Sequence, residues 1–511
     1  MKLKLILFFL PIALLLVWSC DRPTNPVEEG TLAFSSDTIK FDSIFTTFLT
    51  PSERLLVYNE TGKAVQISRV WLQDGADTRF EMIVDGIQSK EVEDVVLANG
   101  DSLFIFVNIV SKLKDEFVEE FLNFQVGDEM QQVLIRAKII DAYFLRSRIR
   151  QENDFLSLDS GSFVFTRDTI LTSEKPIVMD GPIYVPPDIT VTIEPGTEFF
   201  FTPYKFGVTD SNGLPQFAFF SWLIVDGTLI AEGMPGLPII FQGSRFDSLY
   251  QENPAQWRGI RFGQNSKNNI LTHCLIKNGL IGVQVDSSSY TANPKLRMQY
   301  TEIRNMGVHG VVGVGFAGDI FDNSPPMILM ENCKVNTCRE RTLAILGGGK
   351  YEFYNTTFAN FSISRFSRRT PQVLISNWFT FDNVTANVYP SYIDFTNCLI
   401  WGSEEDEMVI DTLMDAPFDR LLLNHCMLAL SEDNAPTITP HLRNSLVNQD
   451  PLFNDVFVRD YRLKEASPAI NAGIDFPEGS SGYEDDFRNA PDTLRYDGFD
   501  IGAYEFYPIE E

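Results

Sequence analysis

Six short segments of this chain share one pattern of apolar and polar positions. Each segment opens with a large apolar residue, has Cys or Thr in its fourth position and has an apolar residue in its sixth. The six segments are Leu271–Asn278, Met298–Asn305, Met330–Thr337, Phe353–Asn360, Phe395–Gly402 and Leu423–Leu430. A motif that recurs along a chain is typical of a solenoid, in which each copy stacks on the one before it.

The third position of each segment marks a corner in the chain. Side chains alternate between the two faces of a strand, so positions one and six cannot both point inward from one straight strand. The residues at position three are His273, Tyr300, Asn332, Asn355, Asn397 and His425. Asn tolerates the left-handed backbone conformation that a sharp corner needs. The pattern therefore predicts strand–corner–strand units in which positions four and six face the core together.

The segments start 27, 32, 23, 42 and 28 residues apart, so each turn of the solenoid carries loops of different length. This pattern resembles right-handed parallel β-helix proteins, the architecture of pectate lyases and of many bacterial surface proteins. The resemblance implies an all-β, pectate-lyase-like solenoid and says little about function. A β-sandwich or a β-propeller is the alternative, but propeller blades are longer and have their own signatures. Residues 183–201, 223–241 and 257–262 fit as earlier turns.

At 511 residues the chain is long enough for more than one domain. Short alternating runs separated by turn signals predict a β-sandwich at residues 31–141. The stretches FDSIFTT and ERLLVYNETGKAVQISRV in this region resemble immunoglobulin-like domains of bacterial surface proteins. We then expect a linker or first solenoid turn at residues 142–175, the parallel β-helix at residues 176–449, and a C-terminal capping segment at residues 450–511, which resembles the segment that closes many such β-helices.

The first 20 residues combine two lysines, a long apolar run and the ending Trp-Ser-Cys, which predicts a signal peptide. A small residue before Cys20 resembles the bacterial lipobox, which implies lipid attachment at Cys20 and a tether at residues 21–30. Trp18 departs from the small residue usual in that motif. A single membrane-spanning segment is the alternative, although the apolar run is short for one. We expect a Bacteroidetes-like envelope lipoprotein, held to the membrane by its lipid, at the outer membrane or cell surface.

Charge and cysteine usage narrow the classes of partner and chemistry. Acidic residues outnumber basic ones by 69 to 41, a formal net charge of −28, which argues against a nucleic-acid partner. Four of the five cysteines after Cys20 occupy the fourth position of a segment. Stacked strands lie about 4.8 Å apart, whereas a disulfide needs its Cβ atoms at about 3.8 Å. We interpret these cysteines as small buried residues and not as a disulfide framework or a metal site.

The longest spacing between segments holds the candidate glycan-binding residues. They are Arg365, Phe366, Arg368, Arg369 and Trp378, and the spacing predicts that they lie on one projecting loop. Arginine pairs with carboxylates through two hydrogen bonds, and aromatic rings stack on sugars. The three arginines are also candidate catalytic residues of a polysaccharide lyase. A loop whose arginines balance nearby acids is the alternative.

Three functions remain open at this point. One is a non-catalytic surface protein that binds a polysaccharide or a surface protein, which we favour, without a cofactor. The second is a polysaccharide lyase or a glycoside hydrolase, which would need two facing carboxylates that the sequence alone does not pair. The third is a structural part of an envelope assembly. In the C-terminal segment Asp486, Asp500 and Glu505 are interleaved with Arg488 and lack calcium-loop spacing, so we expect an ion-paired network, with calcium as the alternative.

Overall fold

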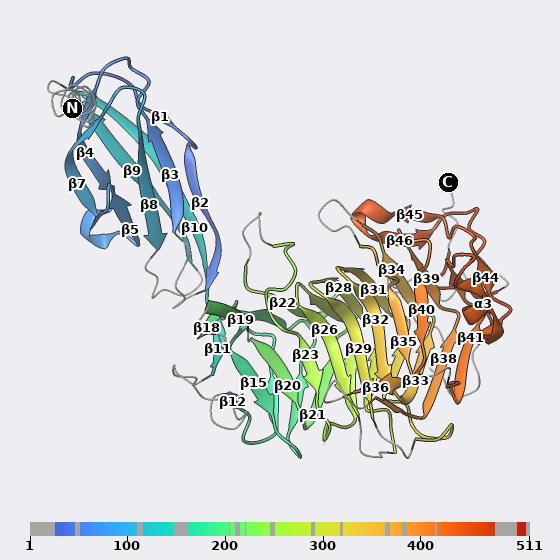
Figure 1. Cartoon of the computed structure of the whole chain (residues 1–511). Coiled ribbons are helices and arrows are strands. Elements are labelled where there is room, and N and C mark those ends of the chain that lie inside the picture. The colour runs from blue at the N-terminus through green and yellow to red at the C-terminus, as the bar shows by residue number, and fades with distance from the viewer. Residues whose placement is uncertain are drawn as a thin grey trace, which may run out of the picture. The chain divides into compact units, whose positions relative to one another are not determined.

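The computed structural model describes residues 26–45, 52–109, 116–147, 162–203, 205–209, 215–219, 221–245, 251–287, 292–316, 320–362, 368–380, 386–413, 416–475 and 498–506. The chain divides into two compact units, Met1–Ala142 and Tyr143–Glu511. Strands dominate both units (Figure 1), which confirms the all-β prediction. Among the described residues, no helix is long and apolar enough to cross a membrane.

The first unit is a β-sandwich of two five-stranded sheets, as the alternating pattern predicts. One sheet has the order β1 (Ala33–Phe34), β3 (Glu53–Tyr58), β8 (Ser102–Ile109), β5 (Phe80–Val84) and β6 (Ile87–Ser89). The other has the order β2 (Thr38–Phe45), β10 (Glu129–Ile140), β9 (Glu116–Val126), β4 (Val65–Leu72) and β7 (Glu91–Leu97). Alternate residues such as Leu55, Val57, Leu122 and Phe124 are fully buried between the sheets, because side chains on a strand alternate between its faces.

The second unit is a right-handed parallel β-helix, which confirms the predicted solenoid. The turns from residue 143 to residue 424 each contribute one strand to each of three parallel sheets, in a fixed order, and the turn after them contributes described strands only to sheets 1 and 3. Sheet 1 consists of β11 (Tyr143–Arg146), β14 (Ile177–Asp180), β17 (Glu198–Phe201), β22 (Ile239–Gly243), β25 (Cys274–Lys277), β28 (Glu302–Met306), β31 (Lys334–Cys338), β34 (Thr357–Asn360), β39 (Leu399–Gly402), β42 (Met427–Leu428) and β44 (Leu446–Val447).

Sheets 2 and 3 have nine and ten strands. Sheet 2 consists of β12 (Phe163–Val164), β15 (Pro182–Val185), β20 (Trp222–Val225), β23 (Ile260–Phe262), β26 (Ile281–Asp286), β29 (His309–Gly315), β32 (Arg341–Gly347), β35 (Val373–Ser376) and β40 (Met408–Asp411). Sheet 3 consists of β13 (Thr169–Leu171), β16 (Thr190–Ile193), β21 (Thr228–Glu232), β24 (Asn269–Thr272), β27 (Leu296–Gln299), β30 (Ile328–Glu331), β33 (Gly349–Tyr354), β38 (Ser391–Thr396), β41 (Arg420–Asn424) and β43 (Leu442–Arg443).

The predicted corner is confirmed at every copy, between a strand of sheet 3 and the next strand of sheet 1. All six residues at position three have a positive φ, between 43° for Asn355 and 53° for Asn397. A seventh copy begins at Leu442 and has Ser445, not Cys or Thr, in its fourth position. Asn444, with φ 49°, forms its corner between β43 and β44.

Position four faces the core, and its polar atom explains why Cys and Thr recur there. The Thr301 hydroxyl donates to the backbone oxygen of Gln299 at 3.0 Å and of Leu271, one turn earlier, at 3.1 Å. The Cys426 thiol donates in the same way to Asn424 O at 3.5 Å and Phe395 O at 3.6 Å. A small side chain that donates a hydrogen bond therefore satisfies corner carbonyls while remaining buried. Burial raises the pKa of the Cys333 thiol to about 12.

The C-terminal segment lies along the outer face of sheet 1. Phe453, Tyr461 and Tyr504 pack with Leu399 and Met427 in a separate apolar cluster. The segment begins with the antiparallel strands β45 (Phe453–Asp455) and β46 (Asp460–Leu463) and includes the 3-10 helix η4 (Val456–Val458). At the C-terminal end of the solenoid, α3 (Ala435–Ile438) and η3 (Thr439–His441) follow β42, and α3 places Ile438 in the main core.

Two antiparallel hairpins interrupt the turns of the solenoid. One pairs β18 (Lys205–Thr209) with β19 (Pro215–Phe219), and the other pairs β36 (Trp378–Phe379) with β37 (Asn387–Val388). The second hairpin follows β35 of sheet 2 and precedes β38 of sheet 3. In the later turns, most of the added chain length therefore lies in loops that run from a strand of sheet 2 to the next strand of sheet 3.

Candidate functional site

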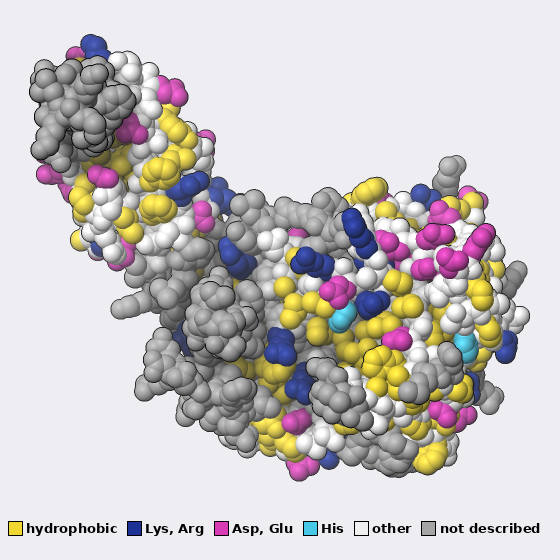
Figure 2. Space-filling view, in the orientation of Figure 1, with side chains coloured by type: hydrophobic (Ala, Val, Ile, Leu, Met, Phe, Trp, Pro, Cys, Tyr) yellow, Lys and Arg dark blue, Asp and Glu magenta, His cyan; other side chains and the backbone are white. Residues whose placement is uncertain are grey.

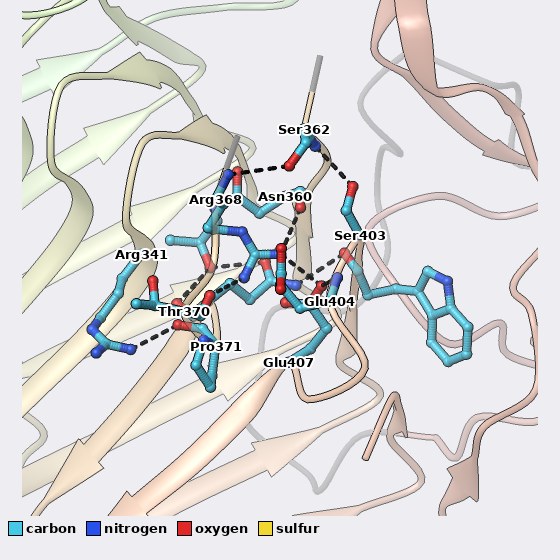
Figure 3. A network of polar contacts seen from close by, with 12 residues as sticks. Arg341, Asn360, Ser362, Arg368, Thr370, Pro371, Ser403, Glu404 and Glu407 are labelled. Carbon is cyan, nitrogen blue, oxygen red and sulfur yellow. Dashed lines mark hydrogen bonds and ion pairs between the residues drawn. The ribbon is translucent and has the colours of Figure 1, made fainter. Parts of the chain in front are cut away.

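Arg368, the central residue of the predicted arginine cluster, is buried in an ion pair. Its Nη2 atom lies 2.6 Å from Glu407 Oε1, with side-chain exposures of 2% and 0%. The same nitrogen donates to Asn360 O at 2.8 Å, and Nη1 donates to Thr370 O. Figure 3 shows this network joining three segments of the chain. Burial raises the pKa of Glu407 although Arg368 opposes the shift. Arg368 is thus placed to hold loops together and not to contact a glycan.

The prediction that the whole segment is one projecting loop is wrong. Strand β35 runs through it, because each turn must supply a strand to sheet 2, and Val373 and Ile375 are fully buried. Trp378 lies beyond this strand, half-buried in β36, and its indole N–H donates to Asp411 at 3.2 Å. Arg368 and Trp378 therefore lie at opposite ends of a strand. Arg369 is exposed, and Arg365 and Phe366 lie outside the described residues.

The residues proposed for calcium are only partly described. Asp486 and Arg488 lie outside the described residues. So does Cys20, the predicted site of lipid attachment. The Asp500 carboxylate accepts hydrogen bonds from the backbone N–H groups of Asn471 at 2.7 Å and Phe506 at 2.6 Å, and Glu505 accepts one from Asp500 N at 3.2 Å. Burial raises the pKa of Asp500 to about 6. Within the described part of the chain, no group of three or more His, Cys, Asp or Glu residues is arranged to hold a metal ion.

The outer face of sheet 3 gathers acidic side chains from three successive strands. The strands are β30, β33 and β38, and the register sets Glu352 directly beside Asp394. In the next row of the same face, Glu331 of β30 lies beside Tyr354 of β33. Neighbouring strands lie about 4.8 Å apart, so the three carboxylates share one small area. We call Arg297, Glu331, Glu352, Tyr354, Asp394 and Arg420 the sheet 3 polar site.

Basic side chains surround these carboxylates. Arg420 Nε donates to Asp394 Oδ1 at 2.8 Å, and Lys350 Nζ lies 3.0 Å from Glu352 Oε1. Glu331 accepts a hydrogen bond from the Gln299 side chain at 2.9 Å. The arginine of the Arg420–Asp394 pair is 42% exposed and its carboxylate 12%. The sheet 3 polar site is therefore open to solvent through its arginines while its carboxylates are largely shielded.

The charged groups of the sheet 3 polar site shift one another's pKa. Burial raises the pKa of Asp394, Arg420 opposes the shift, and the charge of Glu352 adds to it. Burial also raises the pKa of the Tyr354 hydroxyl, and Glu352, Asp394 and Glu331 raise it further in that order. Carboxylates that meet in a partly desolvated area with one raised pKa are typical of sites that bind or transform a polar ligand.

Glu352 and Asp394 fall just outside the eight positions that the segments share, one residue before position one, and Glu331 and Tyr354 fall in position two, where the residue type varies from segment to segment. Extending the aligned segments upstream would have placed Glu352 and Asp394 in one outward column. The alternation of faces then predicts that both point away from the core.

A second surface feature lies near the C-terminal end of the solenoid. It is an open hollow lined by Trp401, Glu404, Glu405, Ala429, Leu430, Glu432 and Asn448. Glu404 also donates its backbone N–H to the buried Glu407 at 2.9 Å. Three of the seven lining residues are acidic, so this hollow would repel an anionic ligand.

Comparisons with known proteins leave the family open. No protein-family model and no curated protein matches this chain. A family 123 glycoside hydrolase from Clostridium perfringens aligns with TM-score 0.16 and 5% identity over 22% of this chain, and this chain spans only 30% of that protein. The catalytic unit of a GH87 α-1,3-glucanase from Streptomyces thermodiastaticus aligns with TM-score 0.28 and 9% identity over 74% of this chain and 75% of that one.

A further GH87 α-1,3-glucanase catalytic domain, solved with tetrasaccharides, aligns with TM-score 0.21 and 12% identity, covering 79% of this chain and 78% of that one. All three solved structures are glycoside hydrolases. Scores this low carry no argument about the activity of this chain, so its function has to be argued from its own residues.

Proposed function

We propose that this chain is a glycan-binding β-helix protein of the cell envelope, and that the glycan lies on the sheet 3 polar site. The observation that carries the proposal is the meeting of Glu331, Glu352 and Asp394 around Tyr354 on the outer face of sheet 3. Sugar hydroxyls donate hydrogen bonds, and carboxylates are strong acceptors for them. Arg297 and Arg420 provide matching donors at the rim of the same area.

The geometry of the sheet supports an extended ligand. Parallel strands repeat every 4.8 Å or so, and polar side chains continue from β27 to β41 along one direction. A linear polysaccharide offers hydroxyl groups at regular intervals and fits such a row of acceptors and donors. Functional residues on a rigid sheet also lose little conformational freedom on binding.

Glycoside hydrolysis is the second candidate, favoured by one specific pair. Glu352 and Asp394 lie directly beside one another on adjacent strands, about 4.8 Å apart at their Cα atoms. Retaining glycoside hydrolases hold their two carboxyl groups about 5–5.5 Å apart. The raised pKa of Asp394 suits a general acid, and Glu352, whose Oε1 lies 3.0 Å from Lys350 Nζ, is the candidate nucleophile. A lyase that uses Arg368 is disfavoured by the burial of that side chain.

The membrane attachment is part of the proposal and rests on the sequence of residues 1–20. A lipid on Cys20 would hold the chain to the envelope, with the β-sandwich of residues 31–141 between the tether and the solenoid. The Cys20→Ala variant should then leave the membrane fraction and appear as a soluble protein. Retention of this variant in membranes would contradict lipid attachment.

A glycan panel tests binding and hydrolysis together. The chain from residue 21 onward is titrated with neutral and uronate-containing oligosaccharides, and new reducing ends are followed over hours. We expect at least one glycan to bind, and Glu352→Gln to weaken it about tenfold or more, because hydrogen bonds to charged groups are worth about 1.5–3 kcal/mol. Glu465→Gln, an exposed change in the C-terminal segment, is the matched control.

The outcomes separate the two candidates. Binding without new reducing ends identifies a binding protein. Release of reducing ends that both Glu352→Gln and Asp394→Asn abolish identifies a hydrolase. Absence of any binding across the panel, or equal affinities for Glu352→Gln and Glu465→Gln, would contradict the sheet 3 polar site as the place of the glycan.

A further inference from the structure

The third and fourth strands of sheet 2, β20 and β23, carry a basic and aromatic cluster on their outer face. Trp222 opens β20, and the register sets Arg261 of β23 beside Ile224 of β20. The guanidinium carbon of Arg258 lies 4.1 Å from the centre of the Trp222 ring, and that of Arg261 lies 5.9 Å from it. One indole ring therefore contacts two cationic side chains, an arrangement in which the cations also repel one another.

The two arginines differ in how their charge is balanced. Arg261 Nη2 lies 2.6 Å from Asp286 Oδ2, and the other oxygen of Asp286 accepts a hydrogen bond from Gln284 at 2.8 Å. Within the described residues, no carboxylate pairs with Arg258. Burial lowers the pKa of Arg258, and the neighbouring charge of Arg261 lowers it further. A half-buried cation without a balancing charge is costly unless a ligand supplies one.

The backbone fixes Arg258 in this place. Its N–H donates to Ser221 O at 2.9 Å, directly before Trp222. The next residue, Gly259, has φ +125°, and a Cβ atom there would lie 1.7 Å from Ile281 O, so only glycine fits. The guanidinium carbon lies 4.1 Å from the centre of the Trp222 ring, and the group carries five N–H donors in one plane. Arg258 is thus a preorganised donor to an anion.

We propose that Arg258, supported by Trp222, binds an anionic group of a polysaccharide, a carboxylate or a sulfate. A guanidinium matches both groups through paired hydrogen bonds. The site offers one unbalanced cation, which suits anions spaced along a sugar chain. A membrane surface would call for a cluster of about four to eight basic residues. Nucleic acid, with a charge every 1.7 Å or so, would be repelled by the net charge of −28.

This anion site is separate from the sheet 3 polar site and does not depend on it. Figure 2 shows acidic side chains gathered toward the C-terminal end of the solenoid, with Lys and Arg side chains among hydrophobic ones on the turns before it. Trp222 and Glu352 lie on different sheets and four turns apart. A change at one site should therefore leave the other intact.

Calorimetric titration of the chain from residue 21 onward tests this proposal with three probes. They are tetragalacturonate, its methyl ester, and a sulfated tetrasaccharide. We expect one or both charged probes to bind, and the ester to bind at least tenfold more weakly. Arg258→Gln should weaken the charged probe about tenfold or more, whereas the control Arg339→Gln, an exposed arginine, should change it less than twofold. Binding of only one charged probe identifies which anion the site takes.

Two further variants distinguish ligand binding from a structural role. Arg258→Lys keeps the charge and loses the paired donors, so it should bind more weakly than the native chain. Arg258→Gln should melt no earlier than the native chain, because it removes an unbalanced cation. Failure of both charged probes to bind, equal affinity for the ester, or equal effects of Arg258→Gln and Arg339→Gln would overturn the proposal.

Discussion

The outer faces of sheets 1 and 3 belong to the same turns of one solenoid and yet differ completely. On sheet 1, Leu399 and Met427 are covered by Tyr461 and Tyr504 of the C-terminal segment. On sheet 3, charged side chains pair across neighbouring strands, as Arg420 does with Asp394. The repeated inward and corner residues of the β-helix form its scaffold. The outward side chains, which do not repeat, decide which face is covered and which can receive a ligand.

Two arginine–carboxylate pairs give the largest contrast between closed and open regions. Arg368→Ala removes the ion-pair partner of the fully buried Glu407 carboxyl group, which should cost about 3–5 kcal/mol of unfolding free energy. Arg420→Ala breaks a partly exposed pair and should cost at most about 1 kcal/mol. Urea unfolding followed by circular dichroism measures both. Similar losses for the two variants would show that the sheet 3 pairs hold the fold together.

Aromatic truncation compares the two faces directly. Tyr461 is 1% exposed on the covered face, and Tyr461→Ala should cost about 3 kcal/mol through lost burial and a cavity. Tyr392 lies partly exposed on the outer face of sheet 3, so Tyr392→Ala should cost less than about 1 kcal/mol. The same unfolding measurement applies, and a larger loss for Tyr392→Ala would contradict the assignment of sheet 1 as the covered face.

Asp500, in the C-terminal segment that covers sheet 1, should make the free energy of unfolding depend on pH. The folded-state pKa of Asp500 is about 6, above its ordinary value near 3.9, so the folded chain keeps a proton that the unfolded chain releases. Its contribution to stability is present in full below about pH 4 and is lost as pH rises through 6, by about 2–3 kcal/mol. Asp500→Asn should flatten this slope. An unchanged slope in that variant would assign the proton to another group.

The smallest expected effect concerns position four of the repeat. Thr301→Val keeps the shape of the side chain and removes its hydrogen bonds to Leu271 O and Gln299 O, which should cost about 1–2 kcal/mol. Thr272→Val on the outward side of β24 is the control and should change stability by about 0.5 kcal/mol or less. Equal effects would mean that the inward hydroxyl contributes nothing beyond packing.

The repeat predicted the solenoid because its chemistry is local. A corner with positive φ needs Asn or another tolerant residue, and a carbonyl near the corner needs a small donor such as Thr301, so both appear in every copy. The same local pattern predicted that the cysteines at position four lie in the core, and Cys333 and Cys426 are fully buried there. Features that repeat in the structure leave a repeated signal in the sequence.

The candidate site could not be predicted in the same way. Arg368 and Trp378 are close in sequence, but a strand separates them, and the partner that buries Arg368 is Glu407, 39 residues later. Glu352 and Asp394 become neighbours only through the register of β33 and β38. Loop lengths that vary from turn to turn hide such pairs, because the spacing between partners is not constant along the chain.

We propose that the sheet 3 polar site receives a glycan. Hydrogen–deuterium exchange of the chain from residue 21 onward, with and without the tightest-binding glycan of the panel, tests it most directly. We expect slower exchange in β30, β33 and β38 and in the loops that enter them, with the β-sandwich unchanged. Protection confined to the β-sandwich, or to strands of sheet 1, would contradict it.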